Sequence, residues 1–265
     1  MNLEKIGTGE RRIPGRSRQG EVSDQEWRTR IDLAACYRLA AYYRMSDQIY
    51  THISARIPGQ GEEILLNPYG MLFSEVTASS LVKVDMDGRV LDDPTGLGIN
   101  KAGFVIHSAI HKARPDVQCV MHTHTRAGVA VAAQRPGLIP ISQHAMRFYG
   151  CLSYHDYEGI ALDMDEQVRL IADLGTNQAM ILRNHGLITA GRTVREAFEL
   201  MYFLEMACQI QIDAQAGGVE LCVPPPAVCE KVARQFTSPG RTPIDDKDWP
   251  ALLRLLDGID PTFRS

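Results

Sequence analysis

The sequence predicts an α/β fold in which helices cover the faces of a sheet, and three observations support this class. Short apolar segments typical of β-strands alternate with longer stretches of helical periodicity. Asp87-Gly88, between Val84 and Val90, is a hairpin signal that places two of those strands side by side. The chain has 265 residues, 45% of them hydrophobic, which is enough to bury a substantial core in one large domain.

Start and stop signals delimit the predicted helices. Ser23 is an N-cap candidate before the periodic stretch 27–45, and Pro115 follows the end of a helix over 102–113. A capping box over 193–196 begins a long helix that reaches about Gln215. Shorter helices are predicted at 127–133, 165–174 and 249–256. The last of these is amphipathic and suits packing or an oligomer contact better than catalysis.

The predicted strands are short apolar runs that end at turn residues or polar residues. They cover residues 49–57, 63–66, 81–84, 117–123, 178–183 and 186–190. Two of them, 117–123 and 178–183, contain or immediately precede histidines at their carboxyl ends. Those ends are therefore the first place to look for a functional site.

The composition argues against several classes of partner and location. A net charge of −4 and a pI near 6.1 disfavour a nucleic-acid-binding surface, which is usually basic. No apolar run is long enough to span a bilayer, and residues 1–20 carry arginines but no apolar core, so no signal peptide is expected there. The six cysteines include no Cys-x-x-Cys pair, which fits a reduced, cytoplasmic protein.

Three histidines are the strongest functional signal in the sequence. His122 and His124 end the apolar run that begins at Val117, and alternate residues of a strand point to the same face. His185 belongs to an Asn-His-Gly turn after a second apolar run. Three imidazoles with an open further position are typical of a catalytic site for zinc or another divalent metal. A metal site at His122, His124 and His185 is therefore preferred to three unrelated polar residues near strand ends.

Several motifs make the chain resemble the class II aldolase/adducin family. They are Ala102-Gly103-Phe104 with His107-Ser108-Ala109-Ile110, Ala113-Arg114-Pro115-Asp116, His122-Thr123-His124-Thr125, and Leu182-Arg183-Asn184-His185-Gly186 followed by the helix 193–208. The resemblance implies a three-layer α/β/α fold with a central, largely antiparallel sheet. It also implies a homotetramer with sites between subunits. By the same resemblance, His122, His124 and His185 fall on the family's metal ligands.

The resemblance also divides the chain into three parts. Residues 1–22 are expected to be a flexible or partner-wrapping arm, and residues 23–220 the family-like domain. Residues 221–265 are expected to be a C-terminal extension that packs on this domain or on a neighbouring subunit. Cyclic symmetry would bring such an extension toward the site of the next chain.

The chain departs from the family's sugar-phosphate aldolases at their substrate-binding positions. Those enzymes carry Ser-Ser-Glu, where the glutamate is the acid/base and the serines hold phosphate; Lys101, Ala102 and Gly103 occupy these positions here. Glycine cannot transfer a proton. Their Gly-Asn-x-Ser and Thr-Pro-x-Gly segments correspond to Thr51-His52-Ile53-Ser54 and Asn67-Pro68-Tyr69-Gly70. A sugar-phosphate substrate is therefore disfavoured, and this stretch is closer to the adducin-type branch.

Three further residues are candidates for the chemistry, each with a structural alternative. His107, on the predicted helix that faces the metal strand, either positions substrate or protonates product, or it is a buried structural histidine. His144 is expected as an extra metal ligand or proton donor, and Arg147 as the bidentate partner of a carboxylate. The alternative for both is a loop cluster of structural hydrogen bonds. A solvated turn is expected at 155–159, and a solvated side chain at Lys101.

The preferred function is a metal-dependent carbon–carbon lyase acting on a small oxygenated carboxylate. Decarboxylation of a hydroxy-aromatic or keto acid is favoured over retro-aldol cleavage, because it needs only an acid to protonate the carbanion. The alternatives are aldol cleavage with His107, His144 or a tyrosine in place of the missing glutamate, a non-enzymatic adducin-like interaction module, and an iron-dependent reaction with dioxygen. Zinc is the expected metal, ahead of manganese, iron or cobalt.

Overall fold

The computed structural model describes residues 18–59, 62–159, 164–237 and 247–265, so most of the predicted arm 1–22 lies outside the described residues. Its strands form one sheet in the order β4-β3-β2-β1-β5-β8-β7-β6. Neighbouring strands are antiparallel except β6 and β7, which are parallel. The strands are β1 His52–Arg56, β2 Glu63–Leu66, β3 Val82–Asp85, β4 Val90–Asp92, β5 Cys119–Thr123, β6 Leu152–His155, β7 Ala179–Leu182 and β8 Gly186–Gly191. The expected largely antiparallel sheet is confirmed.

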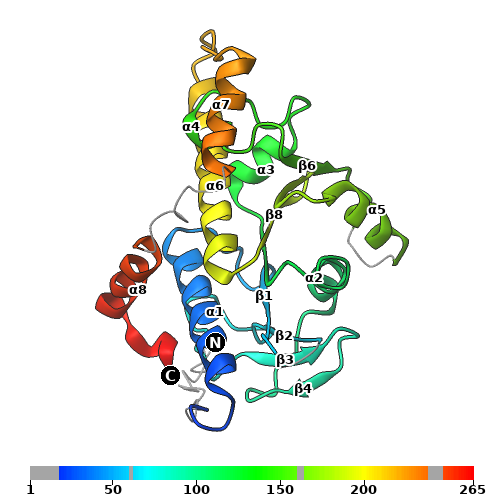
Figure 1. The fold of residues 1–265 in the computed structure, drawn as a ribbon, viewed down its shortest axis with the longest axis vertical. Helices are drawn as coiled ribbons and strands as arrows, with labels where there is room; N and C mark the ends of the chain where they lie inside the picture. The colour runs from blue at the N-terminus through cyan, green and yellow to red at the C-terminus, as the bar shows by residue number, and fades with distance from the viewer. Residues whose placement is uncertain (1–17, 60–61, 160–163, 238–246) are drawn as a thin grey trace, which may run out of the picture.

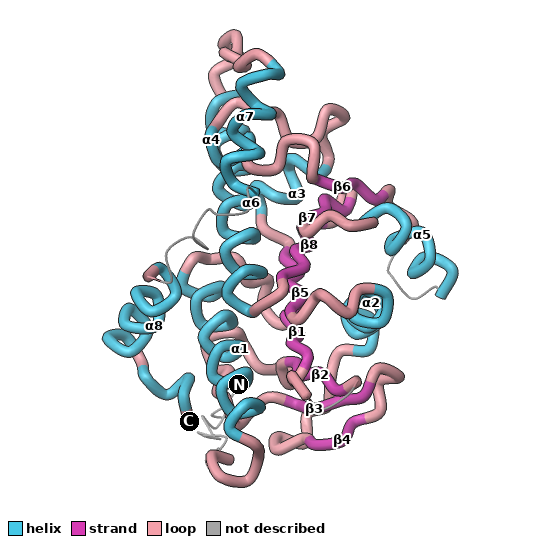
Figure 2. The backbone as a smooth tube through the Cα atoms, in the orientation of Figure 1, coloured by secondary structure: helices cyan, strands magenta, loops and turns pink. Residues whose placement is uncertain are grey.

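Helices on both faces make this sheet the middle of three layers, as Figures 1 and 2 show. Helices α1, α3 and α6 pack on one face, with α8 outside α1, whereas α2 and α5 cover the other face. The helices are α1 Asp24–Tyr42, α2 Lys101–Ala113, α3 Arg126–Ala132, α4 Gln143–Met146, α5 Met164–Leu174, α6 Val194–Gln215, α7 Pro226–Thr237 and α8 Asp248–Ile259. The three-layer α/β/α class is therefore confirmed.

The side chains of β1 pack alternately against the helices on the two faces of the sheet. Ile53 and Ala55 are fully buried in the main hydrophobic cluster, together with residues of α1 and α6. Because strand side chains alternate, His52 and Ser54 point to the opposite layer. There Ser54 hydrogen-bonds to two histidines of α2, and His52 lies against Gly103 of the same helix. This polar row between sheet and helix positions the functional site.

The capping signals in the sequence act as predicted. The Ser23 hydroxyl accepts a hydrogen bond from the Glu26 backbone N–H (3.2 Å) at the start of α1. The Thr193 hydroxyl accepts one from the Glu196 N–H (3.0 Å) at the start of α6. The first strand begins only at His52, later than the predicted residue 49. The preceding residues form a turn, in which the Tyr50 N–H donates to the Asp47 carbonyl (2.9 Å).

The elements β6, α4 and α7 were not predicted from the sequence, and neither was the short 3₁₀ helix Pro261–Arg264. Strand β6 alternates partly exposed with buried polar residues, and only its parallel pairing with β7 identifies it as a strand. The expected solvated turn over 155–159 is wrong for His155, which is buried at the end of β6 and hydrogen-bonds to Asp173 through Nδ1 (2.7 Å). Helix α7 begins directly at Pro226, where a missing N–H costs a helix nothing.

The C-terminal residues pack against α1 of their own chain. The indole N–H of Trp249 on α8 donates to Asp32 Oδ1 on α1 (3.0 Å). Phe263, in the short 3₁₀ helix Pro261–Arg264, is fully buried in the main hydrophobic cluster. Among the described residues, no helix combines the length and the apolar character needed to cross a membrane.

Candidate metal centre

Three imidazoles converge at one edge of the sheet layer. His122 lies on β5, His124 follows the end of that strand, and His185 lies in the turn between β7 and β8. The Nε2 atoms of His122 and His124 are 2.8 Å apart, and those of His124 and His185 are 3.0 Å apart. One ligand atom from each of the three rings lies within 4.8 Å of the others. The structure thus brings together the three histidines that the sequence singled out.

The local backbone explains why the third histidine reaches this point. Asn184 has a φ of 57°, in the left-handed region that asparagine tolerates better than most residues. Gly186 follows His185, and a Cβ atom at Gly186 would lie 2.3 Å from the Thr123 carbonyl oxygen of β5. A larger residue there would push the turn away from β5. The Asn-His-Gly sequence therefore lets the β7–β8 turn close tightly beside His122 and His124.

Hydrogen bonds orient two of the rings so that their Nε2 atoms face inward. His122 Nδ1 donates to the Leu187 backbone carbonyl (3.0 Å), and His124 Nδ1 donates to the carboxylate of Asp47 (3.1 Å). In the neutral rings, both Nε2 atoms then present lone pairs to each other at close range. A divalent cation between them relieves this repulsion, and an outer partner on the other nitrogen is the usual arrangement of a metal-binding histidine. The donor set therefore fits a divalent metal.

Burial favours the neutral, metal-binding form of these rings. Desolvation, reinforced by the neighbouring imidazole of His124, lowers the pKa of His185 to about 4. The same causes, with His185 as a further neighbour, hold the pKa of His122 well below its ordinary value. Neutral imidazole is the form that coordinates metals, so little competition from protons is expected at neutral pH.

The three rings open into a cavity of about 410 Å³, a size that suits a small molecule. Tyr50 and Tyr157 stand at its mouth with half of their surface exposed. Asn100 and Gly103, at the start of α2, also line the cavity. The complete lining is Asp47, Tyr50, His52, Asn100, Gly103, Ile106, His107, His122, His124, Tyr157, Gly159 and His185.

A second histidine cluster lies behind this cavity. His107 and His111, one turn apart on α2, share the hydroxyl of Ser54, with distances of 2.7 Å to His107 Nδ1 and 2.8 Å to His111 Nε2. All three side chains are fully buried. His107 also lines the cavity, and its Nε2 has no hydrogen-bond partner among the described residues. Burial lowers the pKa of His111 to about 3 and that of His107 well below its ordinary value.

A functional role was not predicted from the sequence for His52, Asp47 or Tyr50. His52 faces His122 across the β1–β5 pair, in register with it. Burial, with a smaller effect from His124, lowers the pKa of His52 to about 4. A usable signal existed for His52, because it alternates with Ser54 on a predicted strand just as His122 alternates with His124. No sequence signal links Asp47 to His124, because the contact depends on how the turn before β1 folds back.

His144 and Arg147 do not line this cavity in the chain described here. His144 lies on α4 with its ring 5.3 Å from that of Phe203 on α6, measured between ring centres. Arg147 Nη1 donates to Glu199 Oε1 (2.8 Å), and its guanidinium lies over the Phe203 ring. These contacts are structural hydrogen bonds and ring contacts of the kind named as the alternative. A catalytic role for either residue stays a prediction.

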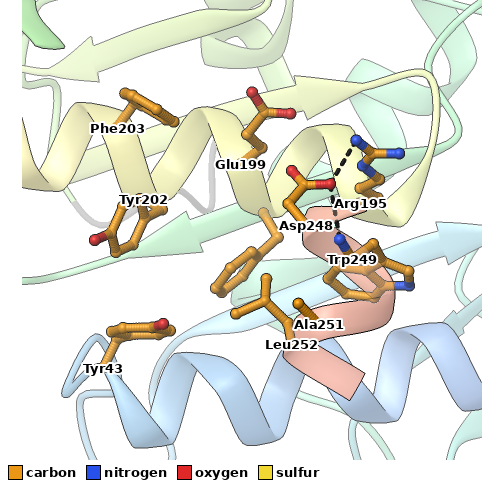
Figure 3. A pocket seen from close by; sticks show the side chains of 10 residues that line it. Tyr43, Arg195, Glu199, Tyr202, Phe203, Asp248, Trp249, Ala251 and Leu252 are labelled. Carbon is orange, nitrogen blue, oxygen red and sulfur yellow. Dashed lines mark hydrogen bonds and ion pairs between the residues drawn. The ribbon is translucent and has the colours of Figure 1, made fainter. Parts of the chain in front are cut away.

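A second cavity, of about 290 Å³, lies between α1, α6 and α8. Figure 3 shows its aromatic and aliphatic walls, with Tyr43 and Tyr202 on one side and Leu252 on the other. Its charges are already paired, because Asp248 binds Arg195 (2.5 Å) and accepts from the Trp249 backbone N–H (2.7 Å). This cavity therefore offers apolar surface rather than reactive groups.

Comparisons with known proteins agree with the fold. Residues 31–212 match the family described as Class II Aldolase and Adducin N-terminal domain. An aldolase II superfamily protein from Pseudomonas syringae has a crystal structure with 56% sequence identity and a TM-score of 0.90, covering 93% of this chain and 99% of that one. An L-fuculose 1-phosphate aldolase from Glaciozyma antarctica has 25% identity and a TM-score of 0.77, covering 94% and 95%.

The same domain also occurs in a much longer protein. Alpha-adducin of Rattus norvegicus is 43% identical over 243 residues, which cover 87% of this chain but only 33% of the adducin. A named aldolase and an adducin thus share this fold. Function therefore has to be argued from the site rather than from the architecture.

Proposed function

We propose that this chain, which belongs to the class II aldolase and adducin family, is a metal-dependent carbon–carbon lyase for a small oxygenated carboxylate. The observation that carries the proposal is the open cavity onto which the Nε2 atoms of His122, His124 and His185 converge. Two of these rings are held by outer hydrogen bonds that leave Nε2 free for a metal. A scaffold protein has no need of such a site.

These three histidines would hold the metal, for which we propose zinc ahead of manganese, iron or cobalt. A bound divalent cation supplies a Lewis acid that stabilises negative charge on substrate oxygens. Asp47 holds the His124 ring through Nδ1, and the Leu187 carbonyl holds His122 in the same way. Within this arrangement, the protein's own groups have to position the proton donor.

Decarboxylation of a hydroxy-aromatic or keto acid fits these groups best. The bond to the carboxylate carbon breaks, its electron pair stays on the remaining carbon, CO₂ leaves, and a proton then adds to that carbon. Solvent supplies this proton, and the neutral His107 can hold the donating water beside the carbon, because Ser54 has one hydroxyl proton for two imidazole partners and can leave the His107 ring proton on Nε2. When Ser54 donates to His107 Nδ1, the ring proton lies on Nε2, which has no other partner among the described residues.

Retro-aldol cleavage is the second candidate, and one observation favours it. This reaction needs a base for the substrate hydroxyl, and Gly103 carries no side chain. The imidazole of His52 lies directly against Gly103 and lines the same cavity. A base is therefore available even though the glutamate of the sugar-phosphate aldolases is missing.

The identity to alpha-adducin supports a third candidate, a non-enzymatic interaction module. The same experiment separates all three. Purified full-length protein is loaded with zinc, manganese, iron or cobalt and offered hydroxy-aromatic acids, keto acids, hydroxy-carbonyl compounds and sugar phosphates. The proposal expects metal-dependent CO₂ release that is lost in His124→Ala. Aldehyde release from an unphosphorylated hydroxy-carbonyl compound would reverse the order of the first two candidates, and inertness of the metal-loaded protein toward every compound would favour the interaction module.

We also propose a homotetramer with the cavity near a subunit boundary. Membership of the family supports this assembly, and a boundary at the mouth of the cavity would cover the exposed Tyr50 and Tyr157. Light scattering at micromolar concentration should give four chains per particle. A monomer under these conditions would contradict the proposal.

A further inference from the structure

The wall of the metal-site cavity contains one contact that leaves no room for a side chain. Gly103 lies near the start of α2. A Cβ atom built on it would stand 1.9 Å from His52 Cδ2 and 2.1 Å from His52 Nε2. Real Cβ atoms essentially never come closer than 3.0 Å to such neighbours. Position 103 can therefore carry only glycine as long as the His52 ring stays where it is.

The surroundings of His52 hold its ring in this place. The residue is 4% exposed, and it lies on β1 in register with His122 on β5. Its ring hydrogen-bonds to the side chain of Asn67. The Asn67 side-chain oxygen in turn accepts from the hydroxyl of the fully buried Tyr37 (2.9 Å). Displacing the ring would break this chain of buried contacts, which makes a simple rotation away from position 103 costly.

We propose that His52 occupies the position that a side chain at 103 would otherwise hold, and that its imidazole contacts the substrate there. This inference rests on the proposed function, because it assumes that the cavity binds a small oxygenated carboxylate. In sugar-phosphate aldolases the equivalent of Gly103 is a glutamate. An imidazole carries no negative charge in either protonation state, so exchanging one for the other removes a carboxylate from the wall. The exchange favours a substrate that is itself a carboxylate.

The specificity of this cavity is therefore set by two residues from different elements. His52 supplies the hydrogen-bonding group, and Gly103 supplies the space for it. The His52 ring can take this place only if position 103 is glycine, because a side chain at 103 and the ring exclude each other. The two positions should behave as one unit under mutation.

The steric part is tested by thermal unfolding of the zinc-loaded full chain. Gly103→Ala should lower the unfolding midpoint by about 3–10 °C, because overpacking a filled site is destabilising. Gly258→Ala on α8 is the matched control, since nothing lies within 4 Å of its Cβ position, and it should leave the midpoint unchanged or raise it. In a His52→Ala background, Gly103→Ala should no longer lower the midpoint. The proposal would be overturned if Gly103→Ala unfolded at the same temperature as wild type. It would also be overturned if Gly103→Ala lowered the midpoint equally in the wild-type and the His52→Ala protein.

The substrate contact is tested by binding, independently of turnover. Glycolate, a minimal hydroxy acid, is titrated into cobalt-substituted protein, and the visible absorption of the metal reports binding. His52→Ala should keep its full metal content but bind glycolate about 10-fold more weakly or worse, with partial recovery in His52→Gln. Unchanged affinity in His52→Ala, or no glycolate binding by the metal-loaded wild type, would overturn the contact.

A carboxylate returned to position 103 tests the effect of charge in the cavity wall. The double variant His52→Ala with Gly103→Glu removes the clash and should bind glycolate more weakly than His52→Ala alone, because two carboxylates repel. Tighter binding than in His52→Ala would overturn this part. If wild-type protein binds glycolate as described but releases neither CO₂ nor aldehyde from any compound, the proposed function fails while the role of His52 and Gly103 stands.

Discussion

Two histidine clusters lie next to each other in this protein, and they differ in which ring nitrogens are free to bind a ligand. In the first, the inner nitrogens of His122, His124 and His185 converge on a cavity. In the second, the Ser54 hydroxyl occupies one nitrogen each of His107 and His111, and the cluster is fully buried. The residue type is the same in both. The hydrogen-bond partners decide which cluster is free to bind a ligand.

The difference shows that a hydrogen bond at Nδ1 leaves Nε2 of a histidine available to a ligand, whereas a hydrogen bond at Nε2, as in His111, occupies that nitrogen. Asp47 and the Leu187 carbonyl take Nδ1 of two rings and leave Nε2 facing the cavity. Ser54 lies between its two rings and joins β1 to α2. We therefore expect the first cluster to govern metal binding and the second to govern mainly stability. His107 belongs to both, because its remaining nitrogen lies at the cavity wall.

The largest effect is expected from removing a ring of the first cluster. His124→Ala deletes the central imidazole, which lies within 3.0 Å of both of the others. Metal content, measured by mass spectrometry of purified protein, should fall from about one ion per chain to a small fraction of that, as expected for a site reduced to two protein ligands. His144→Ala removes an imidazole outside the cavity and should keep its metal. Equal metal content in the two variants would contradict the assignment of the metal to the first cluster.

Ser54→Ala should give the next largest effect, and on stability rather than on metal. It leaves His107 Nδ1 and His111 Nε2 buried without their shared partner. Each of the two orphaned groups costs about 1–3 kcal/mol, so the free energy of unfolding in urea should fall by about 2–6 kcal/mol. Ser108→Ala is the control, because the hydroxyl of this buried serine of α2 bonds, within the part of the chain that the structure describes, only to the Val105 carbonyl of its own helix (3.2 Å). A large loss of metal in Ser54→Ala would contradict the separation of roles.

The pH dependence of stability should report the second cluster. Burial lowers the pKa of His111 from 6.5 to about 3. Between pH 6.5 and pH 3, the His111 ring is therefore protonated in the unfolded chain but not in the folded chain. Stability is therefore full above pH 6.5 and decreases as the pH falls. For His111 alone, the loss between pH 8 and pH 5 is about 2 kcal/mol. Urea unfolding of the metal-free protein at both pH values should show a smaller loss in His111→Gln than in wild type; equal losses would be evidence against a neutral buried His111.

The smallest effect is expected from the outer partner of His124. The carboxylate of Asp47 is 44% exposed, so water can replace part of its contribution. Asp47→Asn should weaken zinc affinity by about 10-fold, the lower end of what outer partners contribute. Asp156→Asn is the matched control, because this exposed carboxylate lies next to the cavity residue Tyr157 in sequence, and it should leave zinc affinity unchanged. Loss of affinity in both variants would point to overall charge rather than to orientation of the His124 ring.

The first cluster could be predicted from the sequence because its signals are local. The spacing of His122 and His124 follows strand alternation, and Asn184 and Gly186 bracket His185 in a turn with recognisable chemistry. The sheet and most helices could be predicted for the same reason. These features depend on residues that are close along the chain.

The remaining parts of the site depend on how strands and helices align. His52 contacts Gly103 only because β1 packs against α2. No local sequence pattern predicts that a ring fills the space where a Cβ of residue 103 would lie. Asp47 meets His124 across 77 positions of sequence. Strand β6 is short and mixed in polarity, and its pairing with β7 had to be known before it could be recognised. Such contacts are set by tertiary register rather than by periodicity.

The most direct test of the central claim is anomalous diffraction from crystals of the full-length protein soaked in turn with zinc, manganese, iron and cobalt. The account predicts one strong peak per chain among the Nε2 atoms of His122, His124 and His185, with at least one coordination position open toward the cavity. The absence of a peak at these atoms with all four metals would contradict it. So would a metal bound elsewhere in the chain while the three rings hydrogen-bond only to one another.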